Sequence, residues 1–204
     1  MQSIHLSGLF IQPVAERIRD WNADGKITED DFERALTTDG RALVDHSMGQ
    51  GDWAPLEDVE GLVGLVAEQV GGETGLVEWA EEIVECWRKD EPIEGLIRSS
   101  RALVDSPGFV VSQASELLVR NADWLYDGGR SVFSVRVRGM REASPALKSL
   151  LGALLARLAV APEGRDFDVR FDGIDSDDLV VFGEALSEEN ADEESRLHQA
   201  ALIA

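Results

Sequence analysis

The sequence predicts an α+β protein, in which a helical N-terminal part precedes a small β-α-β-β unit with an antiparallel hairpin. Two observations support this prediction. Apolar residues recur every three or four positions through the first part of the chain, as in amphipathic helices, and then alternate with polar residues in two later segments, as in strands. We expect a single α+β domain over residues 1–186, made of the helical part, 1–125, and the β-α-β-β part, 130–185. The acidic tail, 187–204, reads as a frayed helix or a docking tail.

Proline, glycine and hydroxyl residues mark the ends of the helices in the N-terminal part. Pro55 suits the first turn of a helix, which the pair Gly71-Gly72 ends, and Thr74 caps the next one. Ser106-Pro107 interrupts the pattern before the last helix of this part. The expected helices cover residues 9–19, 29–37, 40–47, 55–70, 74–87, 92–104 and 108–124.

The C-terminal part combines alternating segments with one strongly apolar helix. Residues 131–138 and 166–172 alternate apolar and polar side chains, so each reads as a strand with one buried face. Ser144-Pro145 opens a Leu-rich helix between these strands, and a turn at 173–177 leads into a third strand, 179–182, which completes a hairpin. Three strands and one helix make a thin layer, so we expect the helical part, or a second copy of the chain, to cover its free face.

The chain is strongly acidic, with 40 Asp and Glu residues against 19 Lys and Arg residues and a formal net charge of −21. This charge argues against binding to nucleic acid, whose phosphates need a basic face, and against docking on anionic lipid. The sequence has no run of about 18 apolar residues that would span a membrane. Its first residues, Met1–His5, lack the basic and apolar stretches of a signal peptide. We therefore expect a cytoplasmic protein.

No set of residues in the sequence is arranged to make or break bonds. Cys86 stands alone, which excludes an internal disulfide and a zinc site made of several cysteines, and its apolar neighbours predict a buried core thiol. The histidines, His5, His46 and His198, are too far apart to suggest a zinc or haem site. No G-x-S-x-G, phosphate-loop or dinucleotide-binding motif occurs. We therefore expect binding rather than catalysis, and the alternative is an enzyme whose acidic residues form no recognisable motif.

One segment, Asp20–Asp31, has the layout of a loop that binds a hard cation. Short side chains bearing oxygen recur at alternate positions, Gly25 takes the sixth place, and a carboxylate closes the twelfth. Ca²⁺ and Mg²⁺ are bound by oxygen ligands, and the glycine permits the sharp turn that wraps the ion. The segment resembles an EF-hand calcium loop. We expect no cofactor unless this segment binds a metal. The resemblance then implies Ca²⁺ or Mg²⁺, held by Asp20, Asn22, Asp24, Lys26 (through its carbonyl), Thr28 and Asp31.

The same residues also predict a helix corner that holds no metal. Asp31 stands where the EF-hand family usually has Glu, Arg19 stands where it has an aromatic residue, and the sequence contains no second loop to pair with the first. Thr28-x-x-Asp31 matches a capping box at the start of the helix over 29–37. Asp, Asn and Gly before it are ordinary turn formers. Both interpretations of the segment remain open from the sequence.

The order of the elements resembles a group of bacterial regulatory domains that are similar in layout to heme-NO-binding domains. The residues that carry the resemblance are Lys26–Glu33, Asp52–Glu57, Trp124, the strand 131–138, Pro145–Leu147 and Gly152. Heme-NO-binding domains use a histidine on a helix as the iron ligand and a Tyr-x-Ser-x-Arg motif for the propionates. This chain has no histidine between residues 47 and 197 and no such motif. The resemblance therefore implies a haem-free, non-enzymatic regulatory or scaffold module that binds a protein partner or forms a homo-oligomer.

Overall fold

The computed structural model of the chain describes residues 3–89, 93–95, 107–128, 132–160 and 167–186. The first part consists of β1 His5–Ser7, α1 Gly8–Ala23, α2 Glu29–Ala35, α3 Thr38–Asp45, β2 Trp53–Pro55, α4 Leu56–Val70 and α5 Glu73–Trp87. The second part consists of α7 Pro107–Leu118, β3 Val119–Arg120, β4 Asp123–Gly128, β5 Val132–Arg138, the 3₁₀ turn η1 Met140–Glu142, α8 Pro145–Val160, β6 Phe167–Asp172 and β7 Leu179–Ala185. The predicted α+β class is confirmed. No helix within these ranges has the length and apolar character needed to cross a bilayer.

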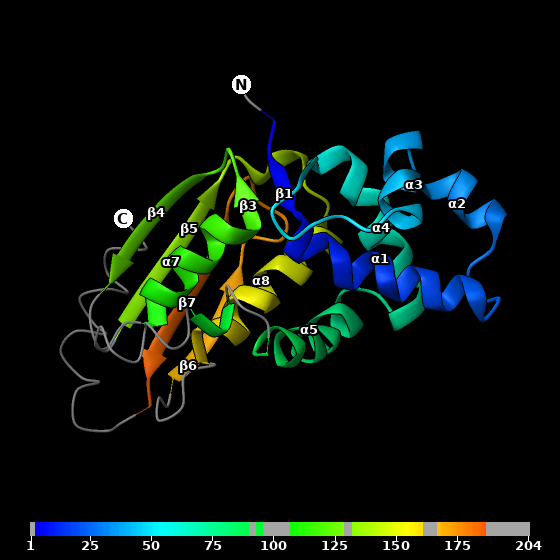
Figure 1. The fold of residues 1–204 in the computed structure, drawn as a ribbon. Helices are drawn as coiled ribbons and strands as arrows, with labels where there is room; N and C mark the ends of the chain where they lie inside the picture. The colour runs from blue at the N-terminus through cyan, green and yellow to red at the C-terminus, as the bar shows by residue number, and fades with distance from the viewer. Residues whose placement is uncertain (1–2, 90–92, 96–106, 129–131, 161–166, 187–204) are drawn as a thin grey trace.

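The helix α8 lies at the centre of the molecule (Figure 1). The helices α1 to α4 gather on one side of it and the four-stranded sheet lies on the other. This sheet is antiparallel with strand order β4-β5-β7-β6, and β6 and β7 form the predicted hairpin. The helix α8 packs on β6 and β7, α7 packs on β4 and β5, and α5 packs against α8. One face of the sheet is therefore covered by two helices of the same chain.

Four short strands depart from the sequence prediction. A helix was expected over 108–124, but α7 ends at Leu118 and the chain continues as β3 and β4. Asn121, with a φ of 62°, makes the left-handed bend between these two strands, a conformation that Asn tolerates better than most residues. The strands β1, β2 and β3 form a second sheet in which Leu6 lies opposite Ala54 and Val119. Most of the helix expected over 92–104, and the whole acidic tail, fall outside the described residues.

Gly152 of α8 allows β6 to approach the helix closely. A Cβ atom placed on Gly152 would lie 2.5 Å from the ring of Phe171, which is too close for two carbon atoms. The buried apolar side chains form one continuous cluster from Ile4 to Val181, and Phe171 packs against it as a partly buried neighbour. A larger residue at position 152 would therefore push the edge of the sheet away from the core.

We predict that Gly152→Ala lowers the free energy of unfolding by about 1–3 kcal/mol, the usual cost of overpacking a core. The matched control is Gly64→Ala in the interior of α4, where an added Cβ meets nothing within 4 Å. That change should raise the free energy of unfolding by up to about 1 kcal/mol, because alanine favours a helix more than glycine does. Urea denaturation of both variants tests the prediction, and equal effects in the two would contradict it.

Candidate functional site

The structure places the predicted cation-binding residues at the corner between α1 and α2. Asp20 and Asn22 lie within α1, and Asp24 caps its C-terminal end. Gly25 follows with a φ of 74°, and the amide of Lys26 donates to the carbonyl of Trp21 over 2.8 Å. Thr28 is the N-cap of α2. The first two predicted ligands are therefore helical residues, and the turn between the helices is held by backbone hydrogen bonds.

Asp31, the carboxylate expected to close the ligand set, is instead part of a capping box. It accepts hydrogen bonds from the amide of Thr28 over 2.9 Å and from its hydroxyl over 2.8 Å. These two bonds lower the pKa of Asp31 below its usual value of 3.8, with a smaller contribution from Arg34. Within the described residues, no group of three or more His, Cys, Asp or Glu side chains could hold a metal ion. The geometry is that of a helix corner, and cation binding stays a prediction.

The cap provides the next prediction: Thr28→Ala should lower the free energy of unfolding by about 1 kcal/mol at neutral pH, the usual cost of losing an N-cap. The folded pKa of Asp31 is depressed, so its stabilising effect is complete above the ordinary value of 3.8 and is lost as the pH falls through the lower folded pKa. The deficit of the variant should therefore shrink below pH 3.8. Thr38→Ala, at an exposed threonine of α3, is the control. Denaturation curves of the parent and the variant at neutral pH and below pH 3.8 measure the effect. A difference in the free energy of unfolding that is the same at the two pH values would contradict the prediction.

Cation binding is tested by following the melting temperature while Ca²⁺ or Mg²⁺ is added. A filled site stabilises the fold by about 2.7 kcal/mol when the free metal is 100 times its dissociation constant. The shift should then disappear in Asp20→Asn and persist in Glu33→Gln, which alters an exposed residue of α2 outside the predicted ligand set. No shift at millimolar metal would remove the cation hypothesis.

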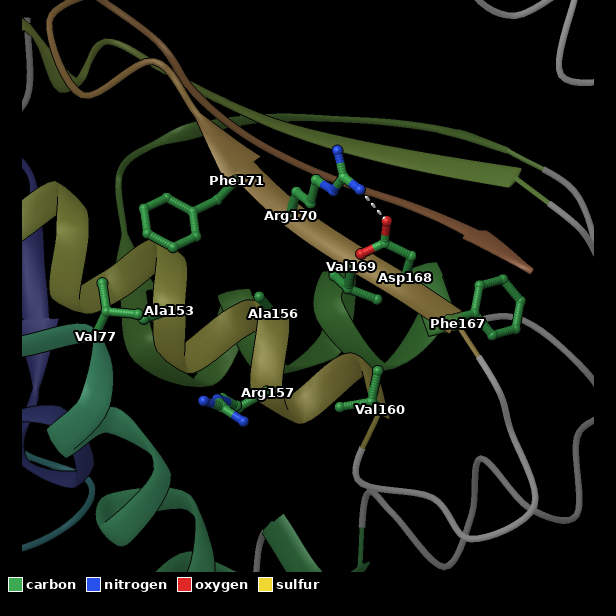
Figure 2. Close-up of a pocket in the computed structure, with 10 residues that line it drawn as sticks. All are labelled: Val77, Ala153, Ala156, Arg157, Val160, Phe167, Asp168, Val169, Arg170 and Phe171. Carbon is green, nitrogen blue, oxygen red and sulfur yellow. Dashed lines mark hydrogen bonds and ion pairs between the residues drawn. The ribbon is translucent and has the colours of Figure 1, made fainter. Parts of the chain in front are cut away.

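A groove of about 450 Å³, which we call the edge groove, lies where α5 and α8 meet β6 (Figure 2). Its walls are mostly apolar: Val77 of α5, Ala153, Ala156 and Val160 of α8, and Phe167, Val169 and Phe171 of β6. Alternation along β6 turns these last three side chains toward α8, and all three are half-buried against the core. The ring of Phe167 lies 6.2 Å from the ring of Phe133 in β5. The groove therefore offers a surface suited to apolar side chains of a bound segment.

The charged groups at the rim of the edge groove are paired with other groups of the chain. Arg157 lies 3.2 Å from Glu81 of α5. Arg170 and Asp168 form an ion pair on the face of β6 that points away from α8 (Figure 2). The hydrogen bond to Asp168 raises the pKa of Arg170. The pKa of Arg170 is thus shifted toward its charged form, which is the opposite of the tuning that a general acid or base requires.

A second pocket, of about 400 Å³, lies between α1 and α5. The guanidinium group of Arg17 lies 5.6 Å from the ring of Trp21 and 5.5 Å from that of Trp79, and it pairs with Glu82 over 2.8 Å. Cys86 lines this pocket and is exposed, so the prediction of a buried core thiol was wrong. The buried face of α5 includes Trp87, and Cys86 is turned about 100° from it around the helix axis, toward solvent.

Comparisons with solved structures show that the chain has the fold of H-NOX domains. No protein-family model and no curated protein sequence matches it. The Fe(II) unliganded H-NOX protein from K. algicida superposes with a TM-score of 0.55 at 10% identity, over 90% of this chain and 98% of that one. A mutant of T. tengcongensis H-NOX gives a TM-score of 0.53 at 10% identity, over 89% and 98% of the two chains. At this identity the likeness establishes the fold.

The described residues do not fit a haem held in the manner of heme-NO-binding domains. The Nδ1 atom of His5 lies 2.9 Å from the carbonyl of Ser3, and that of His46 lies 3.2 Å from the carbonyl of Ala42. His46 lies exposed just after α3 and His5 lies half-buried on β1, so neither presents a fully buried imidazole to an iron. The inner face of β5 consists of Phe133, Val135 and Val137, each at most 1% exposed, and it offers no polar side chain for a propionate.

Sequence reasoning did not find the edge groove, although one signal for it was available. The alternation of Phe167, Val169 and Phe171 predicted a strand with one buried face. It did not indicate that this strand would be at the edge of the sheet, because strand order depends on tertiary pairing. Half-burial of the apolar side chains of a strand indicates that the strand lies at the edge of its sheet. That degree of burial cannot be read from the sequence and is known only from the structure.

Proposed function

We propose that this chain is a non-enzymatic sensory or regulatory module that acts by binding, and that it does so without haem. The observation that carries the proposal is the H-NOX fold over 90% of the chain, combined with the apolar inner face of β5 and the lack of a fully buried histidine among the described residues. The sensory role is proposed because H-NOX proteins are the precedent for it. The absence of haem is proposed because the inner face of β5 is apolar. A module that keeps the fold without the cofactor acts through its surfaces.

The distribution of charge supports binding over catalysis. The carboxylate of Asp31 and the guanidinium groups of Arg41 and Arg170 have pKa values shifted toward their charged forms. In each case the leading cause is a hydrogen bond at the surface: from Thr28 to Asp31, from Arg41 to Glu29, and from Arg170 to Asp168. The hydrogen bonds that cause these shifts connect helix ends and strand residues. Catalytic acids and bases instead have pKa values near neutral pH, where they exchange a proton. The edge groove is the surface that we assign to binding.

A haem titration tests the cofactor part of the proposal. The purified chain is mixed with haemin under reducing, oxygen-free conditions, with the K. algicida H-NOX protein as the positive control. We expect no saturable one-to-one binding and no sharp haem absorption band, because the described interior presents no buried imidazole. A stoichiometric haem complex that His5→Ala, His46→Ala or His198→Ala abolishes would contradict the proposal. So would turnover of a small molecule that depends on a single acidic or histidine side chain.

A further inference from the structure

The strand β6 is at one edge of the four-stranded sheet. In the order β4-β5-β7-β6 it pairs with β7 on one side, and no described strand pairs with it on the other. An edge of this kind presents backbone N–H and C=O groups that can form hydrogen bonds with a further strand. Natural edge strands are often protected by a proline, a lysine or another charged side chain, or a bulge. The strand β6 contains no proline or lysine, and its charged residues are Asp168, Arg170 and Asp172.

The sequence of β6 is complementary to itself when two copies run antiparallel. Residues 167–171 read Phe-Asp-Val-Arg-Phe, so pairing about the central Val169 places Phe167 opposite Phe171 and Asp168 opposite Arg170. We propose that β6 pairs in this register with β6 of a second copy of the chain, so that the two sheets become one continuous sheet. Antiparallel pairing about one residue has two-fold symmetry, which is the usual symmetry of a homodimer.

Both faces of the proposed pairing have favourable contacts. On the outer face, Asp168 of each copy meets Arg170 of the other, so the ion pair already present within β6 is repeated across the interface. On the inner face, each phenylalanine meets a phenylalanine of the second copy, and aromatic pairs and opposite charges are both stabilising when directly opposed. In this register the side chains of both strands alternate in step between the two faces of the sheet. Phe167, Val169 and Phe171 of the second copy therefore lie on the face that α8 covers, next to the edge groove. The second copy therefore completes a wall that Ala156 and Val160 leave open.

The other edge of the sheet lacks this complementarity. The strand β4 reads Asp-Trp-Leu-Tyr-Asp-Gly, and the equivalent pairing about Leu125 would set Asp123 opposite Asp127. Like charges directly opposite destabilise a strand pair, and the net charge of −21 opposes association over most of the surface. The strand β6 carries two acids and one base, a net charge of −1, whereas β4 carries two acids and no base, a net charge of −2. The chemistry of the two edges therefore selects β6 as the self-association surface.

Charge reversal tests the register in the full-length chain. The mass of the protein in solution is measured by sedimentation at about 0.15 M salt, where the Debye length is about 8 Å. The protein concentration is varied from about 1 μM to about 1 mM, because small interfaces give dissociation constants in this range. We expect a dimer whose dissociation constant rises roughly tenfold or more in Asp168→Arg and in Arg170→Asp, because each change opposes like charges. Equimolar mixing of the two variants should restore a dimer that contains one chain of each. The double variant, Asp168→Arg with Arg170→Asp, should dimerise like the parent. Glu33→Arg on α2 changes the net charge by the same amount as Asp168→Arg and is the control for that variant.

A disulfide trap provides a second measurement that does not depend on those charges. Side chains at directly opposite positions of an antiparallel pair have Cβ atoms about 4.5–5.5 Å apart, near the separation of a disulfide. In a Cys86→Ser background, Val169→Cys should cross-link into a dimer under mild oxidation, whereas Leu125→Cys on the exposed edge strand β4 should not. The proposal would be overturned if the parent chain were monomeric at every concentration, or if its dimer were insensitive to the single charge reversals. It would also be overturned if the mixture of variants formed no dimer, or if Val169→Cys gave no cross-link. None of these results bears on whether the chain binds haem.

Discussion

The burial of α8 is the constraint on which the rest of the structure depends. Eleven of its residues are buried, and they cover nearly its whole circumference rather than one stripe. A helix of this kind is stable only when other elements surround it. Here α4 and α5 pack against it on the helical side, α7 lies beside it on the sheet, and β6 and β7 pack against it on the sheet side. The two compositional halves of the sequence are thereby joined into one apolar cluster.

A buried lysine of α8, Lys148, connects this helix to the sheet. Lys148 is 4% exposed, and its ammonium group donates hydrogen bonds to the carbonyls of Ile174, over 3.1 Å, and Ser176, over 2.6 Å. Both carbonyls belong to the turn between β6 and β7, so the first turns of α8 hold one end of the hairpin. Gly152 then allows Phe171 to pack against the helix a turn later. The following residues of α8, from Ala153 to Val160, line the edge groove together with Phe167–Phe171 of β6.

The periodicity of the sequence predicted most of the long helices and the hairpin, because those patterns reflect which face of an element is buried. It failed where tertiary pairing decided the outcome. Val119 and Trp124 fit the helical spacing of the residues before them, yet Asn121 bends the chain and both residues enter strands. The alternation of β6 predicted its buried face and not its place at the edge. The amino-acid sequence of the segment 20–31 was compatible both with a cation-binding loop and with a helix corner closed by a capping box. The hydrogen bonds of Thr28 and Asp31 are those of the capping box.

The small sheet of β2, β1 and β3 has a consequence for how the chain folds during synthesis. Leu6 pairs with Val119, so the first strand can complete its sheet only after more than half of the chain has left the ribosome. Contacts between residues so distant in sequence slow folding, because a long loop must close before they form. The strand β1 and the helices that follow it therefore emerge well before β3, so β1 can pair with β2 long before the ribosome has made the strand that completes the sheet.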